Sequence, residues 1–323
     1  MLNNNFYSRY IKVQKNKHGQ RIDNFLFTYI KYVPKSLIYK IIRKGKILVN
    51  KKKITPRYKL KYKDIISLPL IDNLNVKNKN CTIIKKNIFN ILNNIIIYED
   101  DYLLAINKPH NIAVHGGSGL KFGIIEALRA SRPKYVFLEL IHRLDKETSG
   151  VLLIAKKMIT LRKLHEQFRK FNEIKKNYLV LVKGKWPINL NKISLYLKKN
   201  INKNGNRLMQ VNKLGIISKT NFYVKEKFTI ATLIVAKPIT GKTHQIRVHT
   251  QFYNHPIALD NKYGNNIFNK KITKLCSLNR LFLHASSIKF KHPKTNNTIN
   301  IQAPISEDLE KCLLYLRKYC LLN

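Results

Sequence analysis

Acidic residues are scarce in this 323-residue sequence, in which 17 Asp and Glu stand against 62 Lys and Arg and give a formal net charge of +45. A surface this basic favours a polyanionic partner, and nucleic acids are the obvious polyanions of a cell. The alternative is a solvated basic surface without a partner. Only 13 of the basic residues are Arg, and the chain is rich in Lys, Asn, Ile and Tyr, as AT-rich codons would produce. Under that bias each Arg is the more informative cation.

Cysteine and long hydrophobic runs are also scarce. The four cysteines, at positions 81, 276, 312 and 320, lie far apart without a C-x-x-C pair, which argues against a structural zinc site and a disulfide framework. No run of about 18 apolar residues is present, so we expect no membrane-spanning helix. The first 20 residues lack the apolar core and cleavage site of a secretory signal. We therefore expect a soluble cytoplasmic protein.

Several catalytic signatures are missing as well. The glycine cluster "VHGGSGL" lacks the Lys and Ser or Thr of a phosphate-binding loop, and no G-x-S-x-G or H-E-x-x-H occurs. His244 and His249 are five positions apart on an expected helix, so they point in different directions and cannot share one metal ion. Nucleotide binding, serine hydrolysis and metal catalysis are all disfavoured.

Residues 19–72 have the pattern of a small independent domain. "RIDNFLFTYIKYV" and "VPKSLIYKIIRKG" predict two short helices, with Gly45 just past the second, and "KILVN" and "DIISLP" predict short strands. Positive charge is concentrated on the second helix and the turn that follows it. Such a surface suits phosphate contacts. The residues that we expect to bind RNA are Arg21, Lys35, Arg43 and Lys44.

A polar, Asn-rich segment, residues 73–92, predicts a linker, and a larger domain is expected over residues 93–318. Short strand patterns outnumber helical ones in that larger domain, and many are separated by short connections. The expected fold class is therefore α+β, with a mainly antiparallel mixed sheet flanked by helices.

The stretch "IHRLDKETSG", residues 141–150, places Arg143 and Asp145 between "KYVFLEL" and "VLLIAKK", which both read as buried strands. A carboxylate in such a setting needs a partner, because an unpaired buried charge costs several kcal/mol. A structural ion pair and a chemical role are both compatible with this stretch alone.

Two further stretches favour chemistry. In "PITGKTHQIRVHTQF", Thr243 is placed to cap a helix, and Arg247 lies about one turn into it. If Arg247 paired with Asp145, the carboxylate would stay ionised as a nucleophile or base. In "KKNYLVLV", Tyr178 begins a strand and faces the same way as Val180 and Val182. An aromatic side chain there could stack on an extruded base.

These motifs resemble those of the RluA family of pseudouridine synthases. "HRLDKETSG" matches the family's central signature, and "NKPHNIAVHGG", "KKNYLVLVKG" and "GKTHQIRVH" match its other motifs in order. The N-terminal unit resembles an S4-type RNA-binding domain through "RIDNFL", "PKSLIYKIIRKGKILVN" and "KYKDII". Together the two resemblances cover about residues 19–318. Two departures are visible, since Lys242 stands where the family often has Arg and His110 where Gly is common.

The resemblance implies roles for individual residues. Asp145 becomes the catalytic aspartate, Arg247 its ionic partner, Tyr178 the residue that stacks on the target base, and Arg143 the residue that helps to displace that base. It also implies isomerisation of several uridines of 23S ribosomal RNA, free or in pre-ribosomal large-subunit particles, by a monomer without cofactor, metal or membrane association. A non-catalytic RNA chaperone or assembly factor and an inactive relative that only binds RNA are the alternatives. The expected residue types fill every candidate catalytic position, which argues against the inactive relative.

Overall fold

The computed structural model describes residues 8–30, 35–69, 92, 94–116, 123–170, 173–201 and 207–321. The chain divides into two compact units, a small unit of residues 1–94 with 115–137 and a large unit of residues 95–114 with 138–323. Of the expected linker, residues 73–92, only Leu92 is among the described residues. The domain boundaries given above remain predictions.

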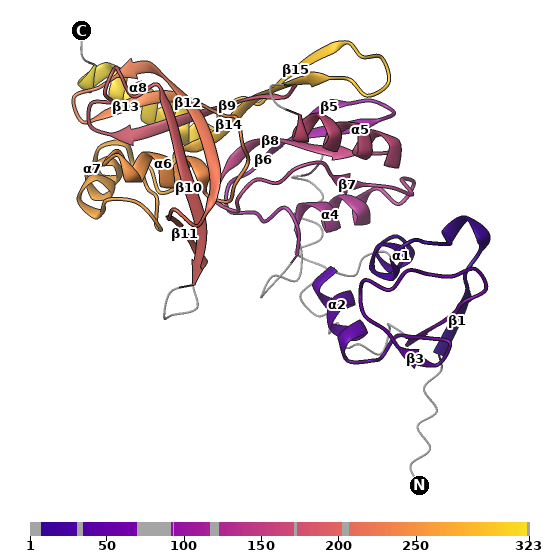
Figure 1. Cartoon of the computed structure of the whole chain (residues 1–323). Helices are drawn as coiled ribbons and strands as arrows, with labels where there is room; N and C mark the ends of the chain where they lie inside the picture. The colour runs from indigo at the N-terminus through magenta and orange to yellow at the C-terminus, as the bar shows by residue number, and fades with distance from the viewer. Residues whose placement is uncertain are drawn as a thin grey trace. The chain divides into compact units, whose positions relative to one another are not determined.

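In the small unit, helices α1 and α2 pack with a four-stranded sheet in the order β1-β4-β2-β3 (Figure 1). Strand β1 lies before residue 19, the expected start of the small domain, and it pairs with β4 along its whole length. The sheet therefore includes residues on the N-terminal side of the expected domain. The elements are α1 (Ile22–Tyr29), α2 (Lys35–Arg43), β1 (Ser8–Lys12), β2 (Leu48–Val49), β3 (Lys52–Lys53) and β4 (Ile65–Pro69), with a 3-10 turn at Lys15–Lys17.

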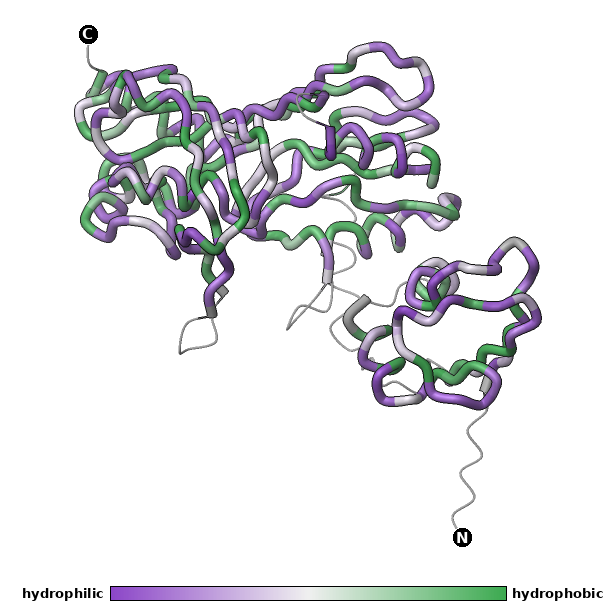
Figure 2. Tube along the Cα trace, viewed as in Figure 1, coloured by the Kyte–Doolittle hydropathy of each residue, from purple (hydrophilic) through white to green (hydrophobic). Residues whose placement is uncertain are grey.

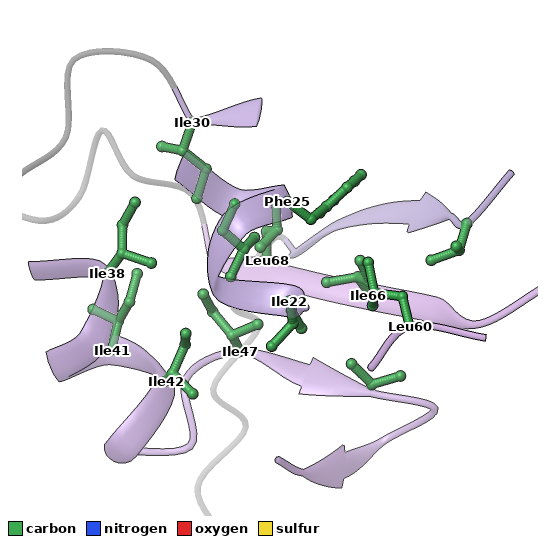
Figure 3. Close-up of a cluster of buried hydrophobic side chains, with 13 residues drawn as sticks. Ile22, Phe25, Ile30, Ile38, Ile41, Ile42, Ile47, Leu60, Ile66 and Leu68 are labelled. Carbon is green, nitrogen blue, oxygen red and sulfur yellow. The ribbon is translucent and has the colours of Figure 1, made fainter. Parts of the chain in front are cut away.

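Branched aliphatic side chains from both helices and the sheet fill the core of the small unit (Figure 3). Ile22 and Leu26 lie one turn apart on α1, and Ile38 and Ile42 repeat this spacing on α2; all four are fully buried. Gly45 ends α2 in the left-handed conformation, with φ of 66°. Its N–H donates to Ile42 O, and the next N–H donates to Ile41 O, which closes the helix end as the sequence predicted.

Residues 123–137, which belong to the small unit, contain helix α4 (Ile124–Ser131). The carboxylate of Glu126 accepts hydrogen bonds from the N–H groups of Gly116 and Gly123. The expected strand over residues 134–140 is mostly absent, since Tyr135 and Val136 are exposed and only the last two residues are extended and paired. In the described ranges, no strand pairs with residues 134–138, and Pro133, which has no backbone N–H, directly precedes them.

The large unit is built on an eleven-stranded sheet in the order β11-β10-β12-β13-β9-β14-β8-β6-β5, with β15 on β14 and β7 on β8. Its strands are β5 (Ile96–Glu99), β6 (Leu103–Lys108), β7 (Glu139–Leu140), β8 (Ser149–Ala155), β9 (Lys175–Lys183), β10 (Lys192–Ile201), β11 (Arg207–Val211), β12 (Ile216–Lys227), β13 (Ala231–Pro238), β14 (Leu283–Lys291) and β15 (Thr298–Gln302). Its helices are α5 (Met158–Arg169), α6 (Gln245–Phe252), α7 (Asn266–Cys276) and α8 (Glu307–Cys320).

Among the pairs formed by these strands, β8 with β14 is parallel and the others are antiparallel, which confirms the expected fold class. Helices cover both faces of the sheet's centre (Figure 1). Val180 and Val182 of β9 pack with Ile246 of α6 on one face. Leu181, between them, packs on the other face against helices α7 and α8. This alternation fixes the direction of every β9 side chain, including Tyr178.

Hydrophobic and hydrophilic residues follow one another at short intervals along the chain (Figure 2). None of the helices in the described ranges is both long and apolar enough to cross a membrane.

Candidate active site

A cavity of about 120 Å³ lies in the large unit where β9, helix α6 and the loop before β8 meet. Its lining includes Arg143 and Asp145 from the loop, Tyr178 from β9, and His244 and Arg247 from the start of α6. The four residues that the sequence selected from three distant motifs therefore come together. Their roles are not tested by this placement and remain predictions.

Asp145 lies in the loop between β7 and β8, with 21% of its side chain exposed to the cavity side. Its neighbour Arg143 is exposed, while Leu144 between them is buried. Arg143 and Asp145 thus line the same cavity, Arg143 from its exposed edge. The buried side chain of Leu144 holds the loop to the core between them.

The expected ion pair between Asp145 and Arg247 is wrong for this structure. Arg247 donates through Nε and Nη2 to both carboxylate oxygens of Asp260, each at 2.7 Å. Its Nη1 lies 2.6 Å from Glu147 Oε2, as an ion pair whose N–H bonds do not point at that oxygen. Among the described residues, the basic group within 4.0 Å of Asp145 is His244.

Arg247 is 1% exposed, so its charge depends on these carboxylates. Burial by itself lowers the pKa of the guanidinium, but the hydrogen bonds and charge of Asp260, then the charges of Glu147 and Asp145, raise it above its ordinary value. The sequence missed Asp260 because its partner lies in another loop. The acidic position in "HPIALDNKYG" is the signal that could have found it.

Lys108, at the end of β6, holds the loop that carries Asp145. Its fully buried Nζ donates to the carbonyls of Pro109, Ile112 and Lys146, at 2.7, 2.9 and 3.2 Å. Burial and the charge of Arg280 lower the pKa of Lys108 to about 7, while the charge of Asp145 opposes that shift. Three carbonyl acceptors occupy three N–H bonds, which fits the ammonium form. Lys108 lies in "NKPHNIAVHGG", but nothing in that motif alone indicates this buried contact.

Gln245, the first residue of α6, fixes the turn that precedes the helix. Its Oε1 accepts from Thr240 Oγ1 and the Lys242 N–H, and its Nε2 donates to Lys219 O and Thr220 Oγ1. The expected cap at Thr243 is wrong, because helix α6 begins one residue later with His244 in the capping position. Lys242, the departure noted in the sequence, is half-buried and lines the cavity.

Tyr178 is the fourth residue of β9 rather than its first, and it faces the same way as Val180 and Val182, as predicted. Burial raises the pKa of its phenol, and the negative charge of Asp145 raises it further. The hydroxyl therefore stays neutral across the physiological range, and the side chain presents an uncharged ring to the cavity.

In the small unit, the residues expected to bind RNA differ in their availability. Arg43 and Lys44, at the end of α2, are exposed. Arg21 is ion-paired with the buried carboxylate of Asp23, which also accepts from Tyr39 Oη at 3.2 Å. The side chain of Lys35 lies outside the described residues. No group of three metal-binding side chains converges in the part of the chain that the structure describes.

Two family models match this chain, one in each unit. Residues 102–252 match the family model of RNA pseudouridylate synthases, and residues 20–66 match that of the S4 domain. The chain is 50% identical over 309 residues to the ribosomal large subunit pseudouridine synthase C of Haemophilus ducreyi, covering 96% of each chain. It is 48% identical over 310 residues to the protein of that name from Escherichia coli, covering 95% of this chain and 96% of the relative.

Solved structures agree on the fold. Human RNA pseudouridylate synthase domain containing 4 is similar with a TM-score of 0.59 and 24% identity, over 72% of this chain and 97% of the human one. Human RNA pseudouridylate synthase domain containing 1 gives a TM-score of 0.53 and 24% identity, over 67% and 86% of the two chains. With half of the residues identical over nearly the whole length of the bacterial relatives, the chain belongs to the pseudouridylate synthases, isomerases that convert uridine in RNA to pseudouridine.

Proposed function

We propose that this protein isomerises specific uridines of large-subunit ribosomal RNA, the 23S rRNA. The observation that carries the proposal is the 50% identity, over 96% of each chain, to relatives named ribosomal large subunit pseudouridine synthase C. The S4 match and the formal charge of +45 support an RNA substrate. The protein would act in the cytoplasm as a monomer, on free 23S rRNA or on pre-ribosomal large-subunit particles.

The reaction breaks the bond between C1′ of the ribose and N1 of the base, turns the detached base, and joins C5 to C1′. Nothing is oxidised or hydrolysed, so the proposed chemistry uses no cofactor. It needs a carboxylate near the ribose, a closed pocket that keeps water from the sugar, and a surface that retains the free base. Asp145, the buried strands beside it and the ring of Tyr178 supply these three requirements in turn.

Arg143 and Arg247 have different proposed tasks. Arg143 is exposed at the rim of the cavity, where it can occupy the gap left in the RNA when the target uridine leaves its stack, a step that costs a few kcal/mol. Arg247 is buried and shares its charge among Asp260, Glu147 and, at longer range, Asp145. It therefore supports the carboxylate through the electrostatic field of the cavity rather than through a direct pair.

Contacts with the rest of the RNA are assigned to Arg21, Lys35, Arg43 and Lys44 of the small unit. Arg43 and Lys44 are the exposed cations of this group at the end of one helix, where two neighbouring side chains can contact successive phosphates. Arg21 is 43% exposed and shares its charge with Asp23, so its proposed phosphate contact is the weaker one.

The test is to incubate the purified protein with unmodified 23S rRNA and to map pseudouridine by carbodiimide-dependent primer extension. Wild type should form pseudouridine at a few positions. Asp145→Asn should form none while its RNA affinity stays within a few-fold. Asp101→Asn, which makes the same chemical change at an exposed turn between β5 and β6, is the matched control and should behave as wild type.

The competing function is RNA binding without catalysis, as in a chaperone or assembly factor, and the same basic surfaces would serve it. That function is supported if wild type forms no pseudouridine on free rRNA or on pre-ribosomal particles and Asp145→Asn binds equally well. Size-exclusion chromatography with light scattering tests the proposed monomer in the same preparation.

A further inference from the structure

His244 has a left-handed backbone conformation, which is uncommon for a residue with a Cβ. Its φ of 52° and ψ of 19° lie in the left-handed region, immediately before the first residue of α6. A side chain with a Cβ pays about 1 to 2 kcal/mol to adopt this conformation, which persists only where the surroundings hold it. The side chain is 10% exposed and lines the cavity. The fold therefore places this imidazole at the cavity against its local backbone preference.

A chain of hydrogen bonds selects one form of the His244 ring. The N–H of Met209, in β11, donates to Tyr263 Oη at 2.9 Å. Tyr263 Oη lies 2.8 Å from His244 Nδ1. The phenol oxygen already accepts the backbone N–H, which leaves its own O–H as the donor that we assign to Nδ1. Nδ1 is then the acceptor, and the proton of the neutral imidazole is on Nε2.

The Nε2–H group that results faces the candidate catalytic carboxylate. Nε2 lies 3.9 Å from Asp145 Oδ2. A shortening of about 1 Å would bring the two atoms within hydrogen-bonding distance, and catalytic contacts commonly tighten when substrate binds. Arg247, the partner expected from the sequence, instead binds Asp260 through Nε and Nη2, and its Nη1 lies beside Glu147.

We infer that His244 is a positioning residue for the isomerisation: Tyr263 fixes its ring as a donor, and its Nε2–H orients one oxygen of Asp145 so that the other faces the ribose. The inference rests on the proposed function of Asp145. It assigns to the pair His244 and Tyr263 the contact that sequence reasoning gave to Arg247.

The charged groups around His244 are consistent with a neutral imidazole. Burial lowers the pKa of His244, the charge of Asp145 opposes this shift, and the cations Arg247 and Lys262 reinforce it, with a smaller opposing effect of Asp260. Tyr263, the remaining titratable group against the ring, has a pKa that burial raises. A neutral imidazole has one N–H group, so the tautomer decides whether the donor faces Asp145 or Tyr263.

Two substitutions of His244 distinguish the role of the Nε2 donor from that of the Nδ1 acceptor. The amide nitrogen of Gln reaches the position of Nε2, so His244→Gln keeps a donor towards Asp145. Asn reaches only the position of Nδ1, so His244→Asn keeps an acceptor for Tyr263 and loses that donor. Asn also tolerates the left-handed conformation better than His, so a defect of His244→Asn cannot come from backbone strain.

The expected result is a split between these variants in single-turnover and steady-state assays on 23S rRNA. His244→Asn should lower kcat about 10- to 100-fold, the range for a lost hydrogen bond to a charged group, with KM and the melting temperature near wild type. His244→Gln should stay within about threefold of wild type. Equal activity of the two variants, or an effect confined to KM, would overturn the inference, the second by pointing to direct contact between His244 and RNA.

Tyr263→Phe tests the selection of the tautomer, because it keeps the ring beside His244 and Arg247 and removes only the hydroxyl. Without that donor, the neutral imidazole can carry its proton on Nδ1 and turn a lone pair towards Asp145. Protonation restores the Nε2–H group. The variant should therefore be impaired at pH 8 and should recover only as the pH falls well below 6.5, because burial lowers the pKa of His244; wild type should not gain activity over that interval. A variant without this recovery contradicts the proposed selection.

The two proposals fail in different ways. If wild type and Asp145→Asn are equally inactive, the proposed function itself is wrong. If Asp145→Asn is inactive and His244→Asn is as active as wild type, the isomerase function stands and the positioning role is wrong.

Discussion

Arg247 is shared between two carboxylates that come from different loops, and this sharing sets the electrostatics of the cavity. Asp260 is fully buried and also accepts the N–H groups of Lys262 and Tyr263. Removing either partner of such a pair leaves an unpaired buried charge, which costs several kcal/mol. At the scale of single residues, Arg247 therefore holds the start of α6 to the following loop, and the carboxylate of Asp145 remains available to the substrate.

The proposed stacking of Tyr178 on the target base can be tested by substituting this single residue. Its ring lines the cavity, and stacking on a nucleobase contributes about 1 to 3 kcal/mol. Tyr178→Ala should lower kcat/KM about 5- to 150-fold, while Tyr178→Phe, which keeps the ring, should stay close to wild type. Steady-state kinetics on 23S rRNA measure both. If Tyr178→Phe were as impaired as Tyr178→Ala, the hydroxyl and not the stacking face would carry the role.

The sequence selected Asp145, Tyr178 and Arg143 as candidates because each lies in a short motif whose pattern is local, and all three line the cavity. It could not identify the partners of Arg247, since Asp260 reaches it through a loop that no periodicity describes. His244 was considered only as a metal ligand, because its left-handed conformation and its contact with Tyr263 arise from tertiary packing. Motifs thus selected the candidate reacting groups, whereas the contacts made by those groups could be seen only in the fold.

At the scale of elements, the parallel pairing of β8 with β14 joins the two halves of the large sheet. Gly150 sits opposite Ala285 with a φ of 110°. A Cβ at this position would lie 2.2 Å from Ala285 O, so only glycine permits the strands to approach. Beside it, Ser149 Oγ accepts from Arg280 Nη2 at 2.6 Å and donates to His284 Nδ1 at 2.9 Å. The junction is therefore closely packed and fully hydrogen-bonded at Ser149.

Gly150→Ala should destabilise the protein by about 2 to 5 kcal/mol, from backbone strain together with overpacking. Gly184→Ala is the matched control, because Gly184 also has a positive φ, of 70°, but has open space around it. That variant should lose only about 1 to 2 kcal/mol. Urea unfolding of both proteins measures the difference, and equal losses would show that the close approach of β14 costs nothing.

Element patterns in the sequence were informative where a strand or helix had one buried face. Gly45 at the end of α2 and the directions of Tyr178, Val180 and Val182 were predicted correctly. The run over residues 134–140 was predicted as a strand because it is apolar, yet only its last two residues pair. An apolar run becomes a strand only where a neighbouring strand offers hydrogen bonds, and that neighbour is not visible in a local pattern.

At the scale of the whole molecule, the net charge of +45 raises the question of whether RNA binding is spread over the surface or concentrated. Arg43→Gln with Lys44→Gln removes two exposed cations from the end of α2. If both contact phosphates of single-stranded RNA, the slope of log affinity against log salt should fall by about 0.7 for each contact. Filter binding at several salt concentrations measures this slope.

Lys270→Gln with Lys271→Gln is the control pair, because these residues are equally exposed neighbours on α7. Its slope should remain close to that of wild type. Equal slopes for the two variants would favour a diffuse basic surface over a defined contact in the small unit.

The β8–β14 junction also has a consequence for when the enzyme becomes active. Ser149 and His284, which meet there, are 135 positions apart in the chain. During synthesis, the strand that completes the centre of the sheet emerges from the ribosome only after most of the large unit has been made. The segments that form the core of the small unit emerge much earlier. A nascent chain can therefore fold its S4 domain well before its cavity is assembled, and modification of RNA must wait until β14 has been made.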